Sequence, residues 1–281
     1  MASNNLKFFG QKSVLKTLVN NSFKALDKGY YDIENNANYE SHQNIDLKKK
    51  LIECKHVPLI TEIKFASPSK GTIIHKKDLK IENIVESMEK ANSCGISILT
   101  QPFLFNGSLD YILKVRKRTN LPILMKDIIV SDVQIKAAKR AGADSILLIK
   151  TIFEKNMTEG SLEKFCEYAK KIGLQIIIET HFVNEFEETV KSNKRNHQIC
   201  DIIGINNRNL DNLTIDLDRT KEILSSCNKN NNLILSESGI SSKKDIINLK
   251  KSGADAFLVG TSLMENINLL GKEINELYLA Y

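Results

Sequence analysis

The segment AGADSILLI, residues 141–149, carries the clearest fold signal in the chain, and it recurs as SGADAFLVG at residues 252–260. In both copies a Gly follows a segment of helical length, where a residue in the left-handed conformation commonly ends a helix. A short apolar run comes next, with the length and composition of a buried strand. The repeat therefore predicts a helix-to-strand joint that the fold uses more than once.

Apolar runs of this kind continue along the chain from residue 57, and segments of helical length separate them. The predicted strands are VPLITEIK (57–64), GISILT (95–100), LPILMKD (121–127), ADSILLI (143–149), LQIIIE (174–179), DIIGIN (201–206), LILSES (233–238) and ADAFLVG (254–260). The predicted helices include residues 81–93, 108–119, 131–141, 161–172 and 242–252, several of which open with a Ser suited to an N-cap. Such alternation indicates a parallel sheet buried on both faces, and eight successive units favour a closed (β/α)8 TIM barrel over an open sheet.

The domain organisation follows from this count. Residues 56–281 are expected to form the barrel, and residues 1–55 read as a helical, lysine-rich N-terminal extension packed against one end of it. Because α/β barrels of this length fold as one unit, residues 1–281 are expected to form a single domain.

Bulk composition narrows the class of protein. The 281 residues are 42% hydrophobic and 26% charged, with a formal net charge of +6. No membrane span is expected, because no stretch stays apolar for about 18 residues. The lysines are scattered and aromatic residues make up only 6% of the chain. This pattern favours a small anionic ligand over nucleic acid as the partner.

The cysteines and histidines give no sign of a metal centre or a disulfide framework. The five Cys and five His are widely spaced, with no CxxC pair and no metal-ligand spacing. We expect free thiols and a cytoplasmic location. No Walker or Rossmann fingerprint is present, so neither a bound nucleotide nor any other cofactor or metal is expected.

Ionisable residues gather at the C-terminal ends of alternate predicted strands, where barrels of this kind carry their active groups. They are Glu62 and Lys64 on the first strand, Lys126 on the third, Glu179 on the fifth and Glu237 on the seventh. A single charge at a strand end is usually solvated. Because alternate strands contribute side chains to one layer, these five are instead predicted to form a ring. Crowded carboxylates and ammonium groups shift one another's pKa, which prepares acids and bases for catalysis.

Two glycine-containing loops predict a phosphate site beside this ring. SESGIS (236–241) follows the seventh strand and VGTSLM (259–264) follows the eighth. In such barrels these two loops commonly bind phosphate through backbone N–H groups and a short helix. SPSKG (67–71), after the first strand, offers a hydroxyl and an ammonium group to the same anion.

Together these residues resemble the indole-3-glycerol phosphate synthase family. The resemblance rests on EIKFASPSKG (62–71), ILTQPFLFNGSLDYILKVR (98–116), LPILMKDIIVSDVQIKAAKRAGADSILLI (121–149), IIGINNRNLDNLTIDL (202–217), LSESGISSKKDI (235–246) and SGADAFLVGTSLM (252–264). It implies closure of the indole ring of 1-(2-carboxyphenylamino)-1-deoxyribulose 5-phosphate with loss of carbon dioxide and water. It implies no cofactor, and a helical extension over the barrel mouth.

The resemblance also implies roles for single residues. Lys126 is expected to protonate the ketone as the aryl carbon attacks, and neighbouring cations are expected to lower the pKa of this lysine. Glu179 is expected to act as a base or to stabilise the cationic intermediate. Lys64 would bind the substrate carboxylate or act as acid in the dehydration, and Glu62 would orient Lys64 or take the last ring proton. The other residues assigned by resemblance are Asn206, Arg208, Glu237, Ser238 and Phe105 around the anthranilate ring and ribulose hydroxyls, and Ser67, Gly239, Gly260 and Thr261 at the phosphate.

The chain departs from the family pattern at four positions. Ile128 stands where a Phe is usual, and Gln101 replaces an acidic residue. Thr261 stands where Ser is common, and its hydroxyl still suits a phosphate. Lys150, after the fourth strand, is not expected from the family pattern, and it is interpreted as a solvated lysine.

Two other functions are weighed against this one. Another phosphate-binding barrel such as phosphoribosylanthranilate isomerase would need a Cys/Asp pair at strand ends, and no Cys stands at a suitable end. A non-enzymatic basic scaffold would show a lysine stripe and would not need Glu62, Lys126 and Glu179 together. Whether another pathway enzyme docks on this chain is left open.

Overall fold

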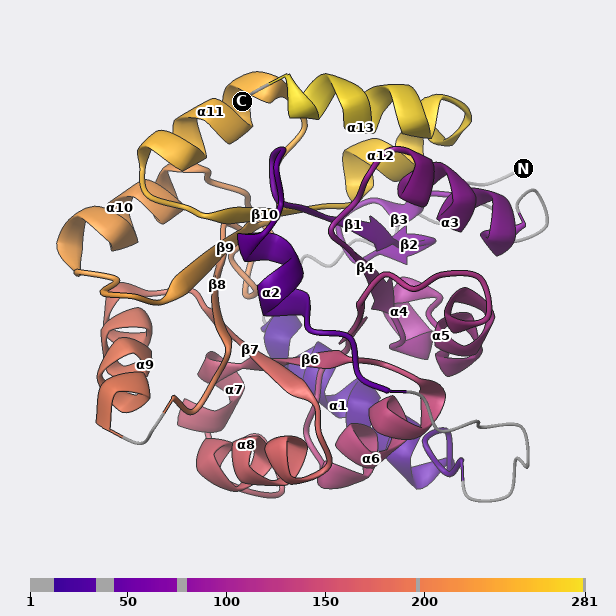
Figure 1. Cartoon of the computed structure of the whole chain (residues 1–281). Helices are drawn as coiled ribbons and strands as arrows, with labels where there is room; N and C mark the ends of the chain where they lie inside the picture. The colour runs from indigo at the N-terminus through magenta and orange to yellow at the C-terminus, as the bar shows by residue number, and fades with distance from the viewer. Residues whose placement is uncertain (1–12, 34–42, 75–79, 196–197, 280–281) are drawn as a thin grey trace.

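The computed structural model describes residues 13–33, 43–74, 80–195 and 198–279, and in it eight parallel strands close into a barrel (Figure 1). Around the barrel the strands follow one another in chain order, and the last, β10, pairs with the first, β1. The barrel strands are β1 Leu59–Ile63, β4 Gly95–Leu99, β5 Ile123–Lys126, β6 Ser145–Ile149, β7 Gln175–Thr180, β8 Ile202–Asn206, β9 Leu233–Glu237 and β10 Ala256–Val259. Seven lie within the predicted runs and β7 extends one residue beyond its run, to Thr180, so the expected TIM barrel is confirmed.

Helices cover the outside of the barrel and also occupy the loops and the extension. A short antiparallel hairpin, β2 Ala66–Ser67 and β3 Gly71–Thr72, follows β1. The helices are α1 Val14–Asp27, α2 Leu47–Ile52, α3 Ile81–Lys90, α4 Pro102–Phe105, α5 Leu109–Arg116, α6 Asp132–Ala141, α7 Lys150–Glu154, α8 Leu162–Lys171, α9 Val183–Arg195, α10 Asp218–Ser226, α11 Lys243–Lys251, α12 Thr261–Glu265, the 3-10 turn η2 Ile267–Leu269 and α13 Leu270–Tyr278.

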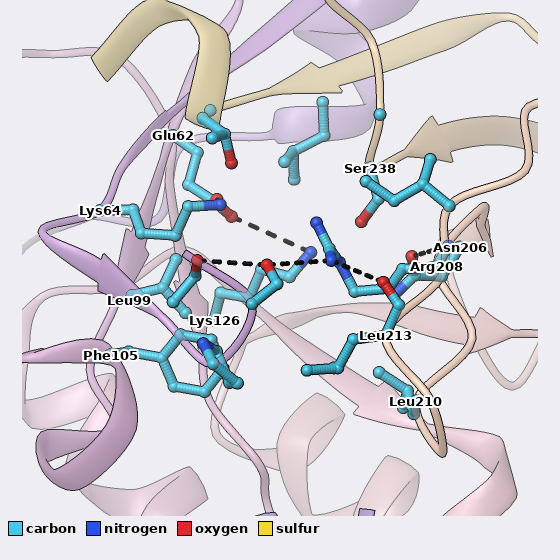
Figure 2. Close-up of a pocket in the computed structure, with 18 of the residues that line it drawn as sticks. Glu62, Lys64, Leu99, Phe105, Lys126, Asn206, Arg208, Leu210, Leu213 and Ser238 are labelled. Carbon is cyan, nitrogen blue, oxygen red and sulfur yellow. Dashed lines mark hydrogen bonds and ion pairs between the residues drawn. The ribbon is translucent and has the colours of Figure 1, made fainter. Parts of the chain in front are cut away.

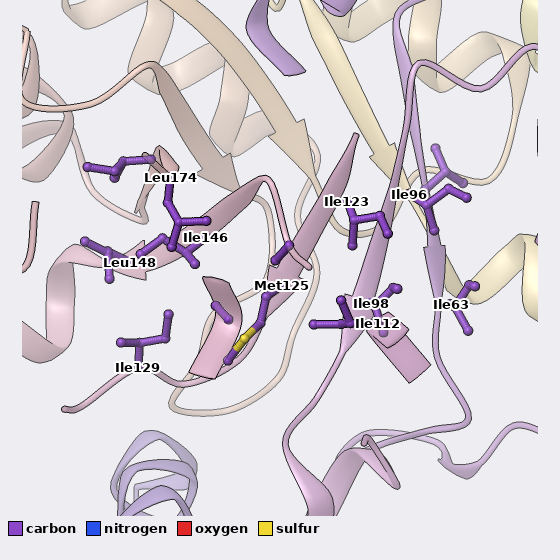
Figure 3. Packing of buried hydrophobic residues seen from close by; sticks show 14 of the residues in the cluster. Ile63, Ile96, Ile98, Ile112, Ile123, Met125, Ile129, Ile146, Leu148 and Leu174 are labelled. Carbon is purple, nitrogen blue, oxygen red and sulfur yellow. The ribbon is translucent and has the colours of Figure 1, made fainter. Parts of the chain in front are cut away.

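The two faces of the strands bury two separate sets of apolar side chains. Outward-facing residues such as Ile98 and Met125 pack beneath the surrounding helices, where they meet Ile112 of α5 (Figure 3). Inward-facing residues such as Ile60 and Leu124 fill the barrel interior. Burial on both faces explains why the strands read as continuous apolar runs in the sequence.

The repeated helix-to-strand joint is confirmed and includes a further element. Gly142 adopts φ +95° at the end of α6, and Gly253 adopts φ +107° just after α11. The Asp that follows each Gly-Ala accepts a backbone N–H bond from the start of the preceding strand, with Asp144 bonding Ile123 at 2.7 Å and Asp255 bonding Ile234 at 2.8 Å. The joint therefore ties neighbouring strands together as well as ending a helix.

The resemblance implied that the N-terminal extension lies over the mouth of the barrel, but only part of the extension does. Helix α1 does, because Leu18 lines the cavity at the C-terminal ends of the strands. Helix α2 lies at the opposite end, where the Leu47 N–H bonds Gln175 Oε1 at 2.6 Å and the Leu47 side chain packs on Gly95. Figure 1 shows α2 in front of the barrel and α1 faded behind it. Residues 1–12 and 34–42 fall outside the described part of the chain.

The helices of the described segments are all too short or too polar to traverse a bilayer.

Candidate active site

A cavity of about 250 Å³ opens at the C-terminal ends of the barrel strands. Figure 2 shows Glu62 and Lys64 on one side of it and Arg208 and Ser238 on the other, with Lys126 between them. The predicted site residues that line this cavity are Glu62, Lys64, Ser67, Phe105, Lys126, Glu179, Asn206, Arg208, Ser238, Gly239, Gly260 and Thr261. The remaining one, Glu237, is fully buried beneath the cavity floor.

The predicted charged ring forms around Lys126. Its Nζ contacts Glu237 Oε2 directly and lies 3.8 Å from Glu179 Oε2 and 4.0 Å from Glu62 Oε2. The three carboxylates come from β9, β7 and β1, and each side chain is at most 4% exposed. Alternation along each strand aims all of them at the barrel axis, as the period-2 spacing predicts.

The direction in which the ring shifts the pKa of Lys126 differs from our expectation. Burial alone would lower this pKa, but attraction to Glu237, Glu62 and Glu179 outweighs burial and raises it. The expectation that neighbouring cations lower this pKa was therefore wrong, because the nearest charges are carboxylates. Lys126 is a fully charged ammonium group at neutral pH in the unliganded site.

Glu62 and Lys64 form an ion pair at the end of β1. Lys64 Nζ donates to Glu62 Oε1 at 2.7 Å. Burial favours the neutral acid, but Lys64 and then Lys126 more than offset this, so the pKa of Glu62 is lowered. A Cβ on Gly260 would stand 2.5 Å from Glu62 Oε1, so the absence of a side chain at Gly260 makes room for this carboxylate. Gly260, predicted only as a phosphate-binding residue, therefore also shapes the acid–base centre.

Glu237 is the buried support of the ring. Desolvation, followed by repulsion from Glu179 and Glu62, raises its pKa to about 7 against the attraction of Lys126. Its Oε1 lies above Gly204, where a Cβ would approach to 2.4 Å. We predicted that Glu237 contacts the substrate directly. In the unliganded structure Glu237 is not part of the cavity lining and contacts Lys126 instead.

Glu179 belongs to a network that the sequence reasoning missed. Burial raises the pKa of Glu179. His181, then Lys126 and a hydrogen bond with Asn206, more than offset burial, so the pKa of Glu179 is lowered. His181 Nε2 lies 3.2 Å from Glu179 Oε1. Both side chains are at most 3% exposed. The sequence does contain a signal for this network, because His181 stands two positions after Glu179 and therefore on the same side of the strand end.

Arg208 and a set of apolar side chains form the opposite wall. Arg208 Nη1 donates to Ser69 Oγ at 3.1 Å and to the Leu213 carbonyl at 3.0 Å, which holds the guanidinium group across the mouth. The apolar lining includes Leu99, Phe105, Ile128, Leu210 and Leu213. This combination suits a flat aromatic ring that carries an anionic group.

Glycine-containing loops and the first hairpin form the third side of the cavity, where we predicted the phosphate. Gly239 has φ +85° and follows Ser238 at φ +70°, so two successive left-handed residues turn the loop after β9. Ser67 Oγ accepts the Lys70 N–H at 3.2 Å, and Lys70 Nζ pairs with Glu265. The predicted ammonium group therefore stands at this wall already paired with a carboxylate.

Three of the departures from the family pattern now have a structural description. Gln101 Oε1 accepts the N–H groups of Phe103 and Leu104 at 3.0 and 3.1 Å, so it caps α4 as an acid would. Ile128 lines the cavity as an aliphatic residue. Lys150 is buried and pairs with Glu188 at 3.0 Å and Glu154 at 3.3 Å, so the expectation of a solvated lysine was wrong.

Asp127, beside Lys126, ties the N-terminal extension to the site. Its Oδ2 accepts from Tyr31 at 2.8 Å and from Thr100 at 2.5 Å. Burial raises the pKa of Asp127 to about 6, although these bonds favour its charged form. Tyr31 follows α1, so the helix over the mouth is anchored one residue from the central lysine.

Within the described ranges, no group of three or more His, Cys, Asp and Glu side chains is arranged to hold a metal ion. The three carboxylates of the ring surround an ammonium group instead.

Comparisons with known proteins agree with the motifs. A family model described as indole-3-glycerol phosphate synthase matches residues 16–277. A relative of that name from Campylobacter fetus is 41% identical over 229 residues, covering 82% of this chain and 84% of the relative. Another from Caldanaerobacter subterraneus is 39% identical, covering 78% and 80%. A solved tryptophan synthase alpha-subunit from Pyrococcus furiosus superimposes with a TM-score of 0.54 at 14% identity, covering 79% of this chain and 98% of that one. At that identity the likeness supports the barrel fold alone.

Proposed function

The chain belongs to the indole-3-glycerol phosphate synthase family, and from that premise we propose how its residues close the indole ring of 1-(2-carboxyphenylamino)-1-deoxyribulose 5-phosphate. The enzyme is a carboxy-lyase of tryptophan biosynthesis that releases carbon dioxide and water. The observation that carries the assignment of roles is the ammonium group of Lys126 held among three buried carboxylates at the base of the cavity.

Ring closure requires a proton at the oxygen of the ketone as the aryl carbon attacks it. Lys126 is the donor, because it is fully charged and its Nζ faces the cavity. The raised pKa of Lys126 depends on the three carboxylates. As the aryl carbon attacks, the ketone oxygen gains negative charge and becomes the stronger base, so it takes the proton from the ammonium group.

Decarboxylation follows when carbon dioxide leaves the aryl carbon that attacked the ketone, and the electron pair of the broken C–C bond restores the aromaticity of the ring. Lys64 binds that carboxylate before it leaves, because its ammonium group faces the cavity opposite Arg208. The Glu62 pair at 2.7 Å fixes the direction of Lys64. Phe105 and the neighbouring aliphatic side chains pack on the aromatic ring.

Dehydration requires an acid at the hydroxyl group and a base for a ring proton. Glu179 is the base, because its lowered pKa keeps it ionised in a buried site. Asn206 holds Glu179 by a hydrogen bond, and Lys64 supplies the acid. Glu237 holds the ammonium group of Lys126 in position from beneath the cavity floor.

The phosphate site is formed by Ser67, Gly239, Gly260 and Thr261. All four line the same cavity, and Thr261 opens α12, where the first backbone N–H groups have no partner within the helix. The same phosphate competes with Glu265 for Lys70, so substrate binding is expected to change the pairing of Lys70.

We propose that the enzyme works in the cytoplasm on a small molecule. The cysteines at positions 54, 94, 166, 200 and 227 are free, which supports a reducing compartment such as the cytoplasm. The partner is a small anionic substrate, and neither nucleic acid nor membrane takes part.

The test is a continuous assay of indole fluorescence with the purified chain, the carboxyphenylamino-deoxyribulose phosphate and a chelator. Turnover in chelator is expected. A folded protein that binds the substrate without turnover would contradict the proposed roles, and the absence of binding would contradict the assignment of the substrate.

A further inference from the structure

The catalytic assignment leaves one group of buried polar side chains unexplained, on the far side of Glu179 from Lys126. His181, Thr151 and Glu185 come from the end of β7, from α7 and from α9, and each is at most 6% exposed. They lie outside the cavity lining, so substrate contact does not account for them. Buried polar groups of this kind are costly unless they are partnered.

The hydrogen bonds fix where the protons of His181 lie. Thr151 Oγ1 donates its one proton to Glu185 Oε1 at 2.6 Å, and that carboxylate also accepts the backbone N–H of His181 at 2.6 Å. Thr151 Oγ1 is therefore an acceptor toward His181 Nδ1, 3.2 Å away. It follows that Nδ1 carries a proton.

The other ring nitrogen faces the proposed base. Nε2 lies 3.2 Å from Glu179 Oε1, within ion-pair distance, and among the described residues neither atom has a hydrogen-bond partner. If Nε2 were unprotonated, Nε2 and Glu179 Oε1 would be two buried acceptors 3.2 Å apart with no donor between them, which is unfavourable. A second ring proton removes this conflict and makes the contact an imidazolium–carboxylate pair.

We propose that His181 is a positioning residue that acts through Glu179, as an imidazolium ion that holds Oε1 and leaves Oε2 as the oxygen that takes the substrate proton. The proposal rests on the proposed role of Glu179 as base. Oε2 is the oxygen on the Lys126 side, at 3.8 Å. When it accepts a proton, Glu179 becomes a carboxylic acid, while both ring protons stay on His181.

The surrounding charges are consistent with an imidazolium ion. The elements packed around His181 carry Glu179 on β7, Glu185 and Glu188 on α9, Lys150 and Glu154 on α7, and Lys126 on β5, and α9 also carries Glu187, Lys191, Lys194 and Arg195. The ammonium group of Lys150 forms ion pairs with Glu154 and Glu188. Glu185 Oε2 lies 3.9 Å from Nδ1, so carboxylates stand on both sides of the ring.

The test combines a spectroscopic readout with pH profiles. In protein labelled with ¹⁵N-histidine, one imidazole is expected to keep both nitrogens protonated at pH 8, and its signals should vanish in His181→Gln. In Glu179→Gln the same signals are expected to move toward a neutral ring. A neutral ring in the wild-type protein would overturn the proposal without reference to activity.

The kinetic arm uses His181→Gln, with His56→Gln as the matched control. His56 stacks on Tyr278, 5.6 Å between ring centroids, and does not line the cavity. Loss of the cation should move the acid limb of the kcat/KM profile upward by about one pH unit, with KM nearly unchanged, because Glu179 then takes up its proton more readily. The control should superimpose on wild type. If the His181→Gln profile also superimposes, His181 is only structural. If wild type itself shows no turnover, the proposed function fails instead.

Discussion

Leu124 and Lys126 stand two residues apart on β5 and point to the same side of the barrel wall, yet their surroundings are opposite. Leu124 is buried among the aliphatic side chains of the interior, on the side of the barrel that α2 covers. Lys126 reaches the cavity and three carboxylates. The same step separates Ile177 from Glu179 on β7 and Leu235 from Glu237 on β9.

The contrast teaches that the inward-facing positions of the same strands provide both the stability and the chemistry of this barrel. The lower layer is apolar and holds the strands together. The upper layer gathers charges that could not be buried individually, because each depends on the others for compensation. Substitutions in the two layers should therefore affect different measurements.

The largest effect is expected in the upper layer, with Lys126→Met. Loss of the proton donor should lower kcat by roughly 10²–10⁴. The near-UV circular dichroism spectrum should stay native, because Met packs in similar space. Turnover close to that of wild type would remove Lys126 from the acid role.

Leu124→Ala makes the matching change in the lower layer. It should lower the free energy of unfolding by about 2–5 kcal/mol through lost burial and the cavity left behind. Where the variant is folded, its kcat should be close to that of wild type. Urea unfolding and turnover measured on the same sample check both statements, and a large loss of kcat with unchanged stability would erase the distinction between the layers.

Gly260→Ala tests where the upper layer meets the phosphate wall. A Cβ at this position would stand 2.5 Å from Glu62 Oε1, so Glu62 must move and carry Lys64 with it. We expect kcat/KM to fall by about 10²-fold, with kcat as well as KM affected. Gly271→Ala is the control, because nothing lies within 4 Å of its added methyl. A change confined to KM would limit Gly260 to phosphate binding.

The smallest effect concerns the pH dependence of stability through Glu237. Its pKa is raised from 4.5 to about 7, so the protonated form is favoured in the folded state. The stability that this contributes is complete below pH 4.5 and is lost as pH rises through 7. Glu237→Gln should remove this dependence, so its stability relative to wild type should rise by on the order of 1 kcal/mol for each pH unit between 4.5 and 7. Free energies of unfolding that change in parallel with pH in the two proteins would contradict this prediction, because they would show that Glu237 makes no separate contribution to the pH dependence.

Most of the fold could be predicted from the sequence because its signals are local. Each buried strand is a short apolar run, and glycines such as Gly142 mark the helix ends. The ring was predictable for the same reason, since period-2 spacing and the end of the strand fix where Glu62, Lys126 and Glu179 point.

What the sequence did not predict depends on contacts between distant segments. The position of α2 is set by bonds such as that from Leu47 to Gln175, which no local pattern encodes. The direction of the Lys126 pKa shift depends on which charges lie nearest in space. The partners of His181 come from α7 and α9, so its role became visible only when they were brought together.

The central claim is that the ammonium group of Lys126 transfers a proton and does more than supply charge. Lys126→Arg tests it most directly, because Arg keeps a cation among the three carboxylates but does not release its proton at neutral pH. The measurement is the single-turnover rate of indole formation with enzyme in excess, which separates chemistry from binding and product release. The account predicts that the variant folds and binds the substrate but loses ring closure by at least about 10²-fold. A single-turnover rate equal to that of wild type would contradict it.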